Sequence, residues 1–543
     1  MQSIEVVLTM LLLVLASGYI VRMLPFSLPL PLVQIALGAG VAAVLHRGVR
    51  LDPEIFFLLF LPPLLFLDGW RIPKEGLFRD ARAILQLALG LVVFTVLGAG
   101  FLIHWLIPAM PLAVAFALAA IVSPTDPVAV SSIAARVPIP RRLMHILEGE
   151  SLLNDASGLV CFRFAVAAVM TGQFSAASAS LTFLWLAVGG VGIGAAVTFG
   201  ISRGHVWITR RFGQDAGAPI LISLLTPFGA YLAAEHLGAS GIIAAVAAGI
   251  SMSYVELSGS ALAATRVQRA AVWDSVHFAL NGIVFVLLGE QLPGILAGAV
   301  ASVEQAGHVN PWWLAVYALA INVGLALLRF AWVLVSLRVS LFAARRRGQS
   351  MAPPSWRLIV ATSLAGVRGA ITLAGVLTLP LLLPDGHAFP ARDLAIFLAT
   401  AVILLSLLVA SIGLPRLLVG LEIPPEPEAA REENLARRDA AKTAITAIER
   451  AQKQLPLASE EPEVYANAAV RVMALYQRRL GDDGTGIDAD ALRKADAAER
   501  VLRVAGLRAE REAIFALARH HRISDDIARK LVREIDLIEA RYS

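Results

Sequence analysis

The chain has 543 residues, of which 57% are hydrophobic and only 16% are charged, and its mean hydropathy is +0.72. Soluble domains carry about 25% charged residues, so this composition excludes an ordinary soluble protein and indicates a polytopic membrane protein. The formal net charge is +5, and the single cysteine excludes an intramolecular disulfide.

Apolar runs of about 20 residues, the length that crosses a bilayer as a helix, recur along the chain up to residue 421 and then stop. The first five residues contain no Lys or Arg, so we expect the first run to be a mature helix rather than a signal peptide. We predict thirteen transmembrane helices, at residues 4–23, 27–46, 52–70, 83–107, 112–135, 143–171, 181–202, 216–236, 239–254, 270–292, 313–342, 359–383 and 394–421.

The distribution of Lys and Arg among the short connections predicts the orientation of these helices. Cytoplasmic connections of membrane proteins carry an excess of both residues. With the N-terminus outside, eighteen Lys and Arg fall in cytoplasmic connections, and three, Arg47, Arg50 and Arg392, fall outside. We therefore expect an external N-terminus and a cytoplasmic C-terminus.

The composition changes at the proline-rich segment that begins at Pro424, after which Ala, Arg, Glu and Leu dominate. Apolar residues at helical spacing, such as Ile527, Leu531 and Ile535, predict amphipathic helices that pack together. We thus expect a transmembrane domain over residues 1–423 and a cytoplasmic helical domain over residues 424–543, for which its position suggests a regulatory role.

The fifth predicted helix contains Ser123-Pro124-Thr125-Asp126-Pro127, in which two prolines flank a carboxylate. Each proline removes a backbone donor and obstructs the turn before it, so we expect the helix to break here. Broken helices in transporters mark binding sites. Asp126 is either part of such a site or only a cap that offsets the positive end of the second half-helix.

The twelfth predicted helix has a similar interruption, Gly366-Val367-Arg368-Gly369. The twelfth helix comes seven helices after the fifth. Because this offset is odd, two similar halves, helices one to six and helices eight to thirteen, would have opposite orientations in the membrane. This predicts an inverted repeat whose two broken helices cross near the midplane. Arg368 would then offset the negative ends of the half-helices, as Asp126 offsets the positive ends.

The sixth predicted helix carries Glu150, Ser151, Asn154 and Asp155 at spacings that form two adjacent polar stripes. A charge at this depth costs at least about 2.5–3.5 kcal/mol, so it indicates an ion path or proton relay. Oxygens of Asp155, Ser151 and Thr125 could hold Na⁺ or K⁺. A proton and a cation would compete for Asp155, although a buried ion pair is the alternative role for this carboxylate.

Three further intramembrane polar groups accompany these stripes. Arg329 in the eleventh helix is the expected partner of Glu150, in a structural ion pair. Asp68, at the cytoplasmic end of the third helix, either contributes to the site or is solvated at the interface. Asn281 in the tenth helix is a further intramembrane polar residue, which belongs with Phe285 and Gly289 to the motifs compared below, and Arg163 in the sixth receives no role from the sequence.

Together these motifs, with Phe60-Leu61-Pro62-Pro63 in the third helix, resemble the monovalent cation/proton antiporters of the sodium/proton exchanger family, in the branch with an Asn-Asp pair. The resemblance covers the thirteen helices. It implies a homodimer in the inner membrane, surrounded by lipid, in which a mobile core domain moves the site past a dimerisation domain. It also implies no enzymatic activity, no cofactor and no nucleic-acid partner.

In this family pattern, Asp155 is the shared carrier of cation and proton, with Asn154, Ser151, Thr125 and Asp126 around it. The Asn154-Asp155 pair, in place of two aspartates, implies electroneutral one-for-one exchange that serves pH homeostasis. The chain departs from many relatives in the third helix, where Leu67 replaces an acid and Asp68 follows it. The contribution of the third helix to cation binding is therefore open.

Two other classes could use intramembrane carboxylates. A cation channel would conduct without obligatory proton movement, whereas an intramembrane aspartyl protease needs Tyr-Asp and Gly-x-Gly-Asp signatures that this sequence lacks. The residues do not choose among sodium, lithium and potassium, because the same oxygens serve all three. They also do not identify the signal that the C-terminal domain senses.

Overall fold

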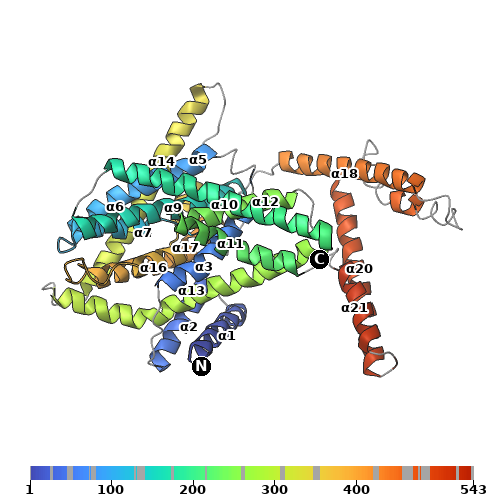
Figure 1. Cartoon of the computed structure of the whole chain (residues 1–543), viewed down its shortest axis with the longest axis horizontal. Helices are drawn as coiled ribbons and strands as arrows, with labels where there is room; N and C mark the ends of the chain where they lie inside the picture. The colour runs from blue at the N-terminus through green and yellow to red at the C-terminus, as the bar shows by residue number, and fades with distance from the viewer. Residues whose placement is uncertain are drawn as a thin grey trace. The chain divides into compact units, whose positions relative to one another are not determined.

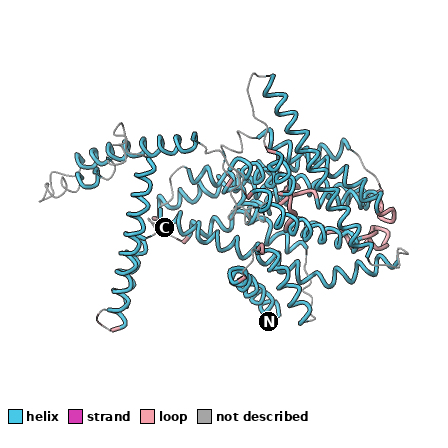
Figure 2. Tube along the Cα trace, turned by 180° about the vertical axis from the view of Figure 1, so that it is seen from behind, coloured by secondary structure: helices cyan, strands magenta, loops and turns pink. Residues whose placement is uncertain are grey.

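The structure is a computed structural model of the whole chain. It describes residues 2–24, 28–45, 53–72, 74, 81–126, 130, 141–172, 176–213, 217–257, 263–305, 312–346, 355–419, 427–454, 469–474, 477, 489–520, 522 and 525–539. The chain divides into two compact units, Met1–Ile423 and Pro424–Ser543. In the described part of both units, the backbone is helical apart from short connections (Figure 2).

The first unit consists of apolar helices, which confirms the expected all-α membrane class. Eight of its described helices are long and apolar enough to cross a membrane, and three shorter apolar helices accompany them. The count of thirteen spans stays a prediction. In chain order the helices are α1 (Gln2–Met23), α2 (Leu30–Leu45), α3 (Pro53–Arg71), α5 (Ala81–Leu85), the π-helix η1 (Gln86–Leu91), α6 (Val92–Leu106), α7 (Leu112–Val122), α9 (Arg141–Thr171), α10 (Ala176–Phe212), α11 (Ala218–His236), α12 (Gly241–Leu257), α13 (Ala263–Gln305), α14 (Trp312–Arg346), α15 (Trp356–Leu364), α16 (Ala370–Leu377) and α17 (Arg392–Leu418).

Two interruptions fall where the sequence predicts them. Helix α7 ends at Val122, and residues 123–126 are not helical. The rest of the predicted fifth span, apart from Val130, lies outside the described residues. Residues 365–369 separate α15 from α16 in the same way. The two interruptions touch, because the backbone N–H of Asp126 donates to the carbonyl of Val367 at 2.7 Å.

The helices of the first unit pack as two groups. The framework helices α1, α2, α3, α10, α11, α12 and α13 contact one another, and in Figure 1 α1 and α2 lie beside α13. The core helices α5, η1, α6, α7, α9, α14, α15, α16 and α17 form the second group. The groups meet where α13 contacts α16 and α17, and where α3 contacts α9 and α16.

Close helix crossings hold the framework together. Helices α2 and α13 approach so closely at Gly38 and Gly289 that a side chain at either position would collide with the backbone of the other helix. Small residues allow such crossings in membranes, where tight packing takes the place of the hydrophobic effect. They hold α13 firmly against α2, on the side of the framework that faces the core helices.

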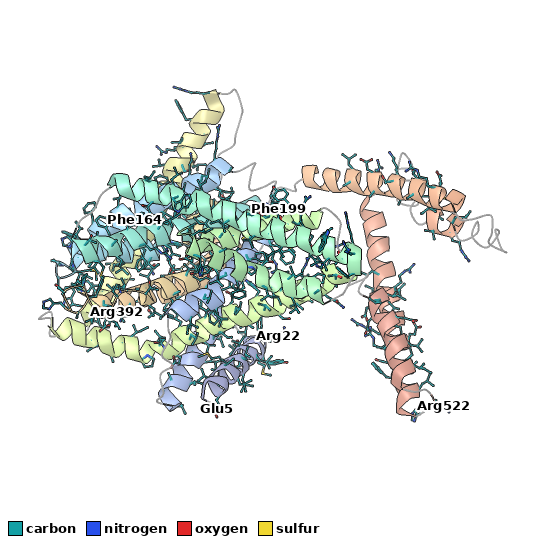
Figure 3. The ribbon with its side chains drawn as sticks, viewed as in Figure 1. Glu5, Arg22, Phe164, Phe199, Arg392 and Arg522 are labelled. Carbon is teal, nitrogen blue, oxygen red and sulfur yellow. The ribbon has the colours of Figure 1, made fainter. Side chains whose placement is uncertain are left out.

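The outer faces of these helices carry apolar side chains, as expected for a surface in contact with lipid. Phe199 and Trp207 on α10 are 46% and 61% exposed, and Leu221 on α11 is 61% exposed. Figure 3 shows Phe199 on the outside of its helix. By contrast, the buried polar residues of α9 lie inside the bundle.

The second unit contains three long described helices, α18 (Pro427–Gln454), α20 (Ala489–Arg519) and α21 (Asp525–Glu539). Helices α20 and α21 pack together through Ile514 and Ile535. Arg511 on α20 pairs with Asp536 on α21 at 2.9 Å, and also with Glu539. The apolar spacing seen in the sequence therefore corresponds to a helical hairpin.

Candidate functional site

A small cavity lies between the framework and core helices. Its volume is about 40 Å³, room for roughly three waters or a partly hydrated cation. Five of the residues that the sequence proposed for the cation site line it. They are Asp68 on α3, Thr125 and Asp126 beyond α7, and Ser151 and Asp155 on α9; Leu61, Leu64, Leu65, Pro124, His277, Asn281, Gly369, Ile371 and Thr372 complete the lining.

Asp155 and Ser151 reach the cavity from one face of α9, because residues four apart are stacked on a helix. Asp155 is 7% exposed and Ser151 is 6% exposed, so both side chains are buried apart from the cavity. Next to them, Ser157 donates through its Oγ to the carbonyl of Ala88 in η1 at 2.7 Å. The π-helical turn η1 thus contacts α9 at Ser157, two residues after Asp155.

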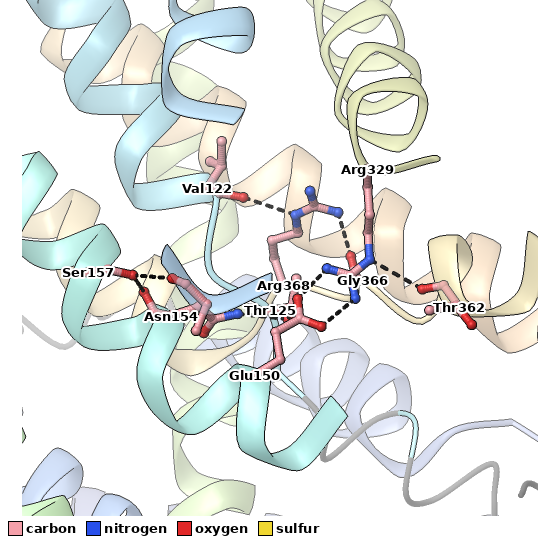
Figure 4. A network of polar contacts seen from close by, with 10 residues as sticks. Val122, Thr125, Glu150, Asn154, Ser157, Arg329, Thr362, Gly366 and Arg368 are labelled. Atoms are coloured by element: carbon pink, nitrogen blue, oxygen red, sulfur yellow. Dashed lines mark hydrogen bonds and ion pairs between the residues drawn. The ribbon is translucent and has the colours of Figure 1, made fainter. Parts of the chain in front are cut away.

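Asn154 lies behind the cavity rather than in its lining. Its Nδ2 donates to Thr125 Oγ1 at 3.0 Å, and the Thr125 hydroxyl in turn donates to Glu150 Oε1 at 3.3 Å (Figure 4). In the structure as described, Asn154 Oδ1 has no hydrogen-bond partner. This chain of contacts fixes the position of Thr125. The Thr125 hydroxyl is engaged by Asn154 and Glu150, and the residue also borders the cavity.

Glu150 and Arg329 form a two-pronged ion pair inside the core group. Arg329 Nη2 donates to Glu150 Oε2 at 2.8 Å, and Nη1 donates to Oε1 (Figure 4). Arg329 Nε also donates to the carbonyl of Thr362 on α15 at 3.2 Å. The pair joins α9, α14 and α15. Glu150 does not line the cavity, so a purely structural role is the simplest reading of its position.

Arg368 lies between the ends of two half-helices. Its Nε donates to the carbonyl of Val122, the last residue of α7, at 2.9 Å, and its Nη1 donates to the carbonyl of Gly366 (Figure 4). Its backbone N–H donates to Ser406 Oγ on α17 at 3.1 Å. A cation at carbonyl ends is favourable because the C-terminal end of a helix carries a partial negative charge.

Asp126 lies beside the start of α16. The residue before this helix is Gly369, and a side chain there would collide with the Asp126 carboxylate. A negative charge at a helix N-terminus is favourable for the same reason that a positive charge is favourable at the other end. The two charges of the crossing, Asp126 and Arg368, therefore lie at helix ends of opposite sign.

The third helix presents Asp68, and not Leu67, to the cavity. Leu67 is buried in the apolar cluster of α3, α11 and α12, whereas Asp68 is exposed. A shift of one residue along a helix turns a side chain by about 100°. The sequence left open whether the third helix contributes an acid to the site. In the structure, Asp68, the residue after Leu67, lines the cavity.

Sequence reasoning missed His277, which lines the same cavity one turn before Asn281 on α13. Its spacing of four from Asn281 in an apolar run was the available signal. Arg163, which the sequence left without a role, lies 3.7 Å from Glu235 of α11. This contact joins a core helix to a framework helix.

The arrangement can bind a small hard cation, because carboxylate, hydroxyl and amide oxygens surround a cavity of suitable size. Three carboxyl groups, those of Asp68, Asp126 and Asp155, line the cavity, and the neighbouring cations Arg329 and Arg368 are held by other partners. A carboxylate in such a cavity can hold either a proton or a cation.

Known proteins have sequences similar to that of this chain. A family model described as sodium/hydrogen exchanger, transmembrane, matches residues 8–420. A protein of Escherichia coli named as the uncharacterized Na(+)/H(+) exchanger YjcE is 42% identical, over 99% of this chain and 99% of that protein. The sodium, potassium, lithium and rubidium/H(+) antiporter of Bacillus subtilis is 39% identical, over 99% of this chain and 78% of the relative.

A solved structure has a similar fold. The sodium proton antiporter MjNhaP1 from Methanocaldococcus jannaschii matches with a TM-score of 0.56 and 17% identity, over 78% of this chain and 99% of that one. At this identity the match concerns the fold alone. The family model, in contrast, covers most of the sequence, and both relatives align along nearly the whole chain. The chain belongs to the sodium/hydrogen exchanger family.

Proposed function

We propose that this chain is a secondary transporter that exchanges a monovalent cation for a proton across the membrane, with the two competing for Asp155. The observation that supports this most is the cavity in which Asp155, Ser151 and Thr125 meet between two helix groups. Bound cation and proton exclude each other at one carboxylate, so a site that changes sides only when occupied exchanges one for the other. Asp126 and Asp68 add negative charge around this site.

Sodium is the proposed substrate, with potassium and lithium as further candidates. The Bacillus subtilis relative is named for sodium, potassium, lithium and rubidium. A cavity lined by oxygens with room for water does not impose one ionic radius, and selectivity then depends on the number and field strength of the ligands. We expect the three ions to differ in KM more than in the maximal rate.

The coupling we propose is electroneutral, one cation for one proton. Beside Asp155, the neighbouring position holds Asn154, which cannot carry a second titrating charge. Alternating access would move the core helices past the framework helices, within a homodimer in the inner membrane. Thirteen spans in two inverted repeats, an external N-terminus and a cytoplasmic, regulatory tail over residues 424–543 belong to the same proposal.

Asp155→Asn tests the role of the carboxylate. Asparagine keeps the shape of the side chain but cannot bind and release a proton, so sodium-driven proton flux in proteoliposomes should fall to the level of empty liposomes. The matched control is Asp393→Asn, at an exposed position outside the cavity, which should exchange like the wild type. Exchange at the wild-type rate by Asp155→Asn would refute the assignment, and sodium current without proton flux in the wild type would indicate a channel.

A further inference from the structure

His277 and Asn281 lie one turn apart on α13, and both line the cavity that contains Asp155. Neither has a role in the exchange as described so far. Asn281 Nδ2 lies 2.8 Å from His277 Nε2. With the amide oriented as in the structure, its NH₂ donates and the imidazole Nε2 accepts, an arrangement that requires the His277 tautomer with its proton on Nδ1.

This hydrogen bond decides which end of the Asn281 amide is available to the cavity. The nitrogen is occupied by His277, so Oδ1 is the atom left to face a bound ion. Among the described residues, no donor to this Oδ1 is found. An amide oxygen is a good ligand for a monovalent cation, whereas an amide NH₂ in the same place would repel it.

We propose that Asn281 supplies an oxygen ligand to the transported cation, and that His277 is a positioning residue that keeps this oxygen turned toward the cavity. The proposal rests on the proposed cation site at Asp155, and it adds a ligand from the opposite wall. Asp155 lies on the core helix α9, whereas Asn281 lies on the framework helix α13. The cation would thus be held between the two groups.

The charges around His277 are compatible with a neutral ring and a bound cation. Arg71 on α3 pairs with Asp274, which lies one turn before His277 on α13. The carboxylates that line the cavity come from α3, the segment after α7, and α9: they are Asp68, Asp126 and Asp155.

The test is sodium-driven proton flux by the full-length chain in proteoliposomes, measured over a range of sodium concentrations. Loss of one ligand from a cation costs about tenfold in affinity, so Asn281→Ala should raise the sodium KM about tenfold while kcat stays within about twofold. His277→Leu removes the acceptor and should raise KM similarly. His277→Gln retains an acceptor oxygen and should keep KM close to that of the wild type.

A double variant separates positioning from direct binding. If His277 acts only through Asn281, the variant with both His277→Leu and Asn281→Ala should have the KM of Asn281→Ala alone, because effects that pass through one group are not additive. Ser275→Ala is the matched control on the same helix, since Ser275 is exposed and its hydroxyl bonds only within α13. It should leave KM unchanged.

Binding without transport gives a second measurement. Sodium should raise the midpoint of thermal unfolding of the wild type in detergent, and the rise should be smaller for Asn281→Ala, because the stabilisation by a ligand grows with the logarithm of its concentration relative to Kd. An unchanged KM and an unchanged sodium effect in Asn281→Ala, beside an inactive Asp155→Asn, would overturn this proposal alone. Retained exchange by Asp155→Asn would instead overturn the proposed function.

Discussion

Glu150 and Asp155 lie on the same helix five residues apart, yet their surroundings give them different expected roles. Glu150 has no exposed surface and is held by two nitrogens of Arg329, whereas Asp155 borders the cavity. A carboxylate that is permanently paired is poorly available to a cation. The sequence led to the same division, because Arg329 was the expected partner of Glu150 and Asp155 was the expected cation carrier.

Glu150→Gln is expected to destabilise the protein while leaving its affinity for sodium unchanged. The variant leaves the Arg329 guanidinium buried without a negative partner, which costs about 3–5 kcal/mol. The midpoint of thermal unfolding in detergent should therefore fall clearly. The pair of the partly buried Arg392 with the exposed Asp393 is the control, since breaking a pair at the surface with Asp393→Asn costs about 1 kcal/mol or less.

The opposite result would change the assignment of Glu150. If Glu150→Gln unfolds at the wild-type temperature but shows a raised sodium KM, Glu150 is a cation ligand and not a structural partner. Both measurements can be made on the same preparation. The distances to Arg329 could not be derived from the sequence, because they depend on how α9 and α14 pack.

At the scale of helices, apolar length and proline predict much of the fold. Each of the thirteen predicted spans contains at least part of a described helix, and α7 ends just before the predicted break at Pro124. The π-helical turn η1 could not be predicted, because its residues, Gln-Leu-Ala-Leu-Gly-Leu, also suit an ordinary helix. That turn depends on contacts with α9, which are long-range.

Gly369→Ala tests the crossing of the two interrupted helices. Its added methyl group would displace the Asp126 carboxylate from the start of α16, so we expect exchange to fall at least about tenfold, as for a misplaced group in an active site. Gly200→Ala is the control, because a methyl group there meets open space on α10. The measurement is the initial rate of sodium-driven proton flux.

The two outcomes for Gly369→Ala are clearly separated. Wild-type flux would mean that the close approach of Gly369 to Asp126 is not required for transport. Reduced flux together with a normal unfolding temperature would place the defect in the site and not in the stability of the fold. Such a close approach cannot be predicted from sequence, because it joins residues from two distant helices.

At the scale of the whole molecule, the cavity is made by two helix groups that contribute different chemistry. The core group provides Asp155, Ser151 and Thr125, and the framework group provides Asp68, His277 and Asn281. Motifs in the sequence identified every core residue in this set. They gave no role to the framework residues of α13, because a helix face is oriented by packing and not by local pattern.

The central claim is electroneutral cation/proton exchange, and coupled flux in proteoliposomes tests it most directly. The wild-type chain is reconstituted, a pH gradient is imposed, and sodium, potassium or lithium is added while the membrane voltage is held at zero. We predict that sodium collapses the gradient, and that the rate does not change when a voltage is then applied. Absence of cation-dependent proton movement would contradict exchange, and a rate that follows the applied voltage would contradict one-for-one coupling.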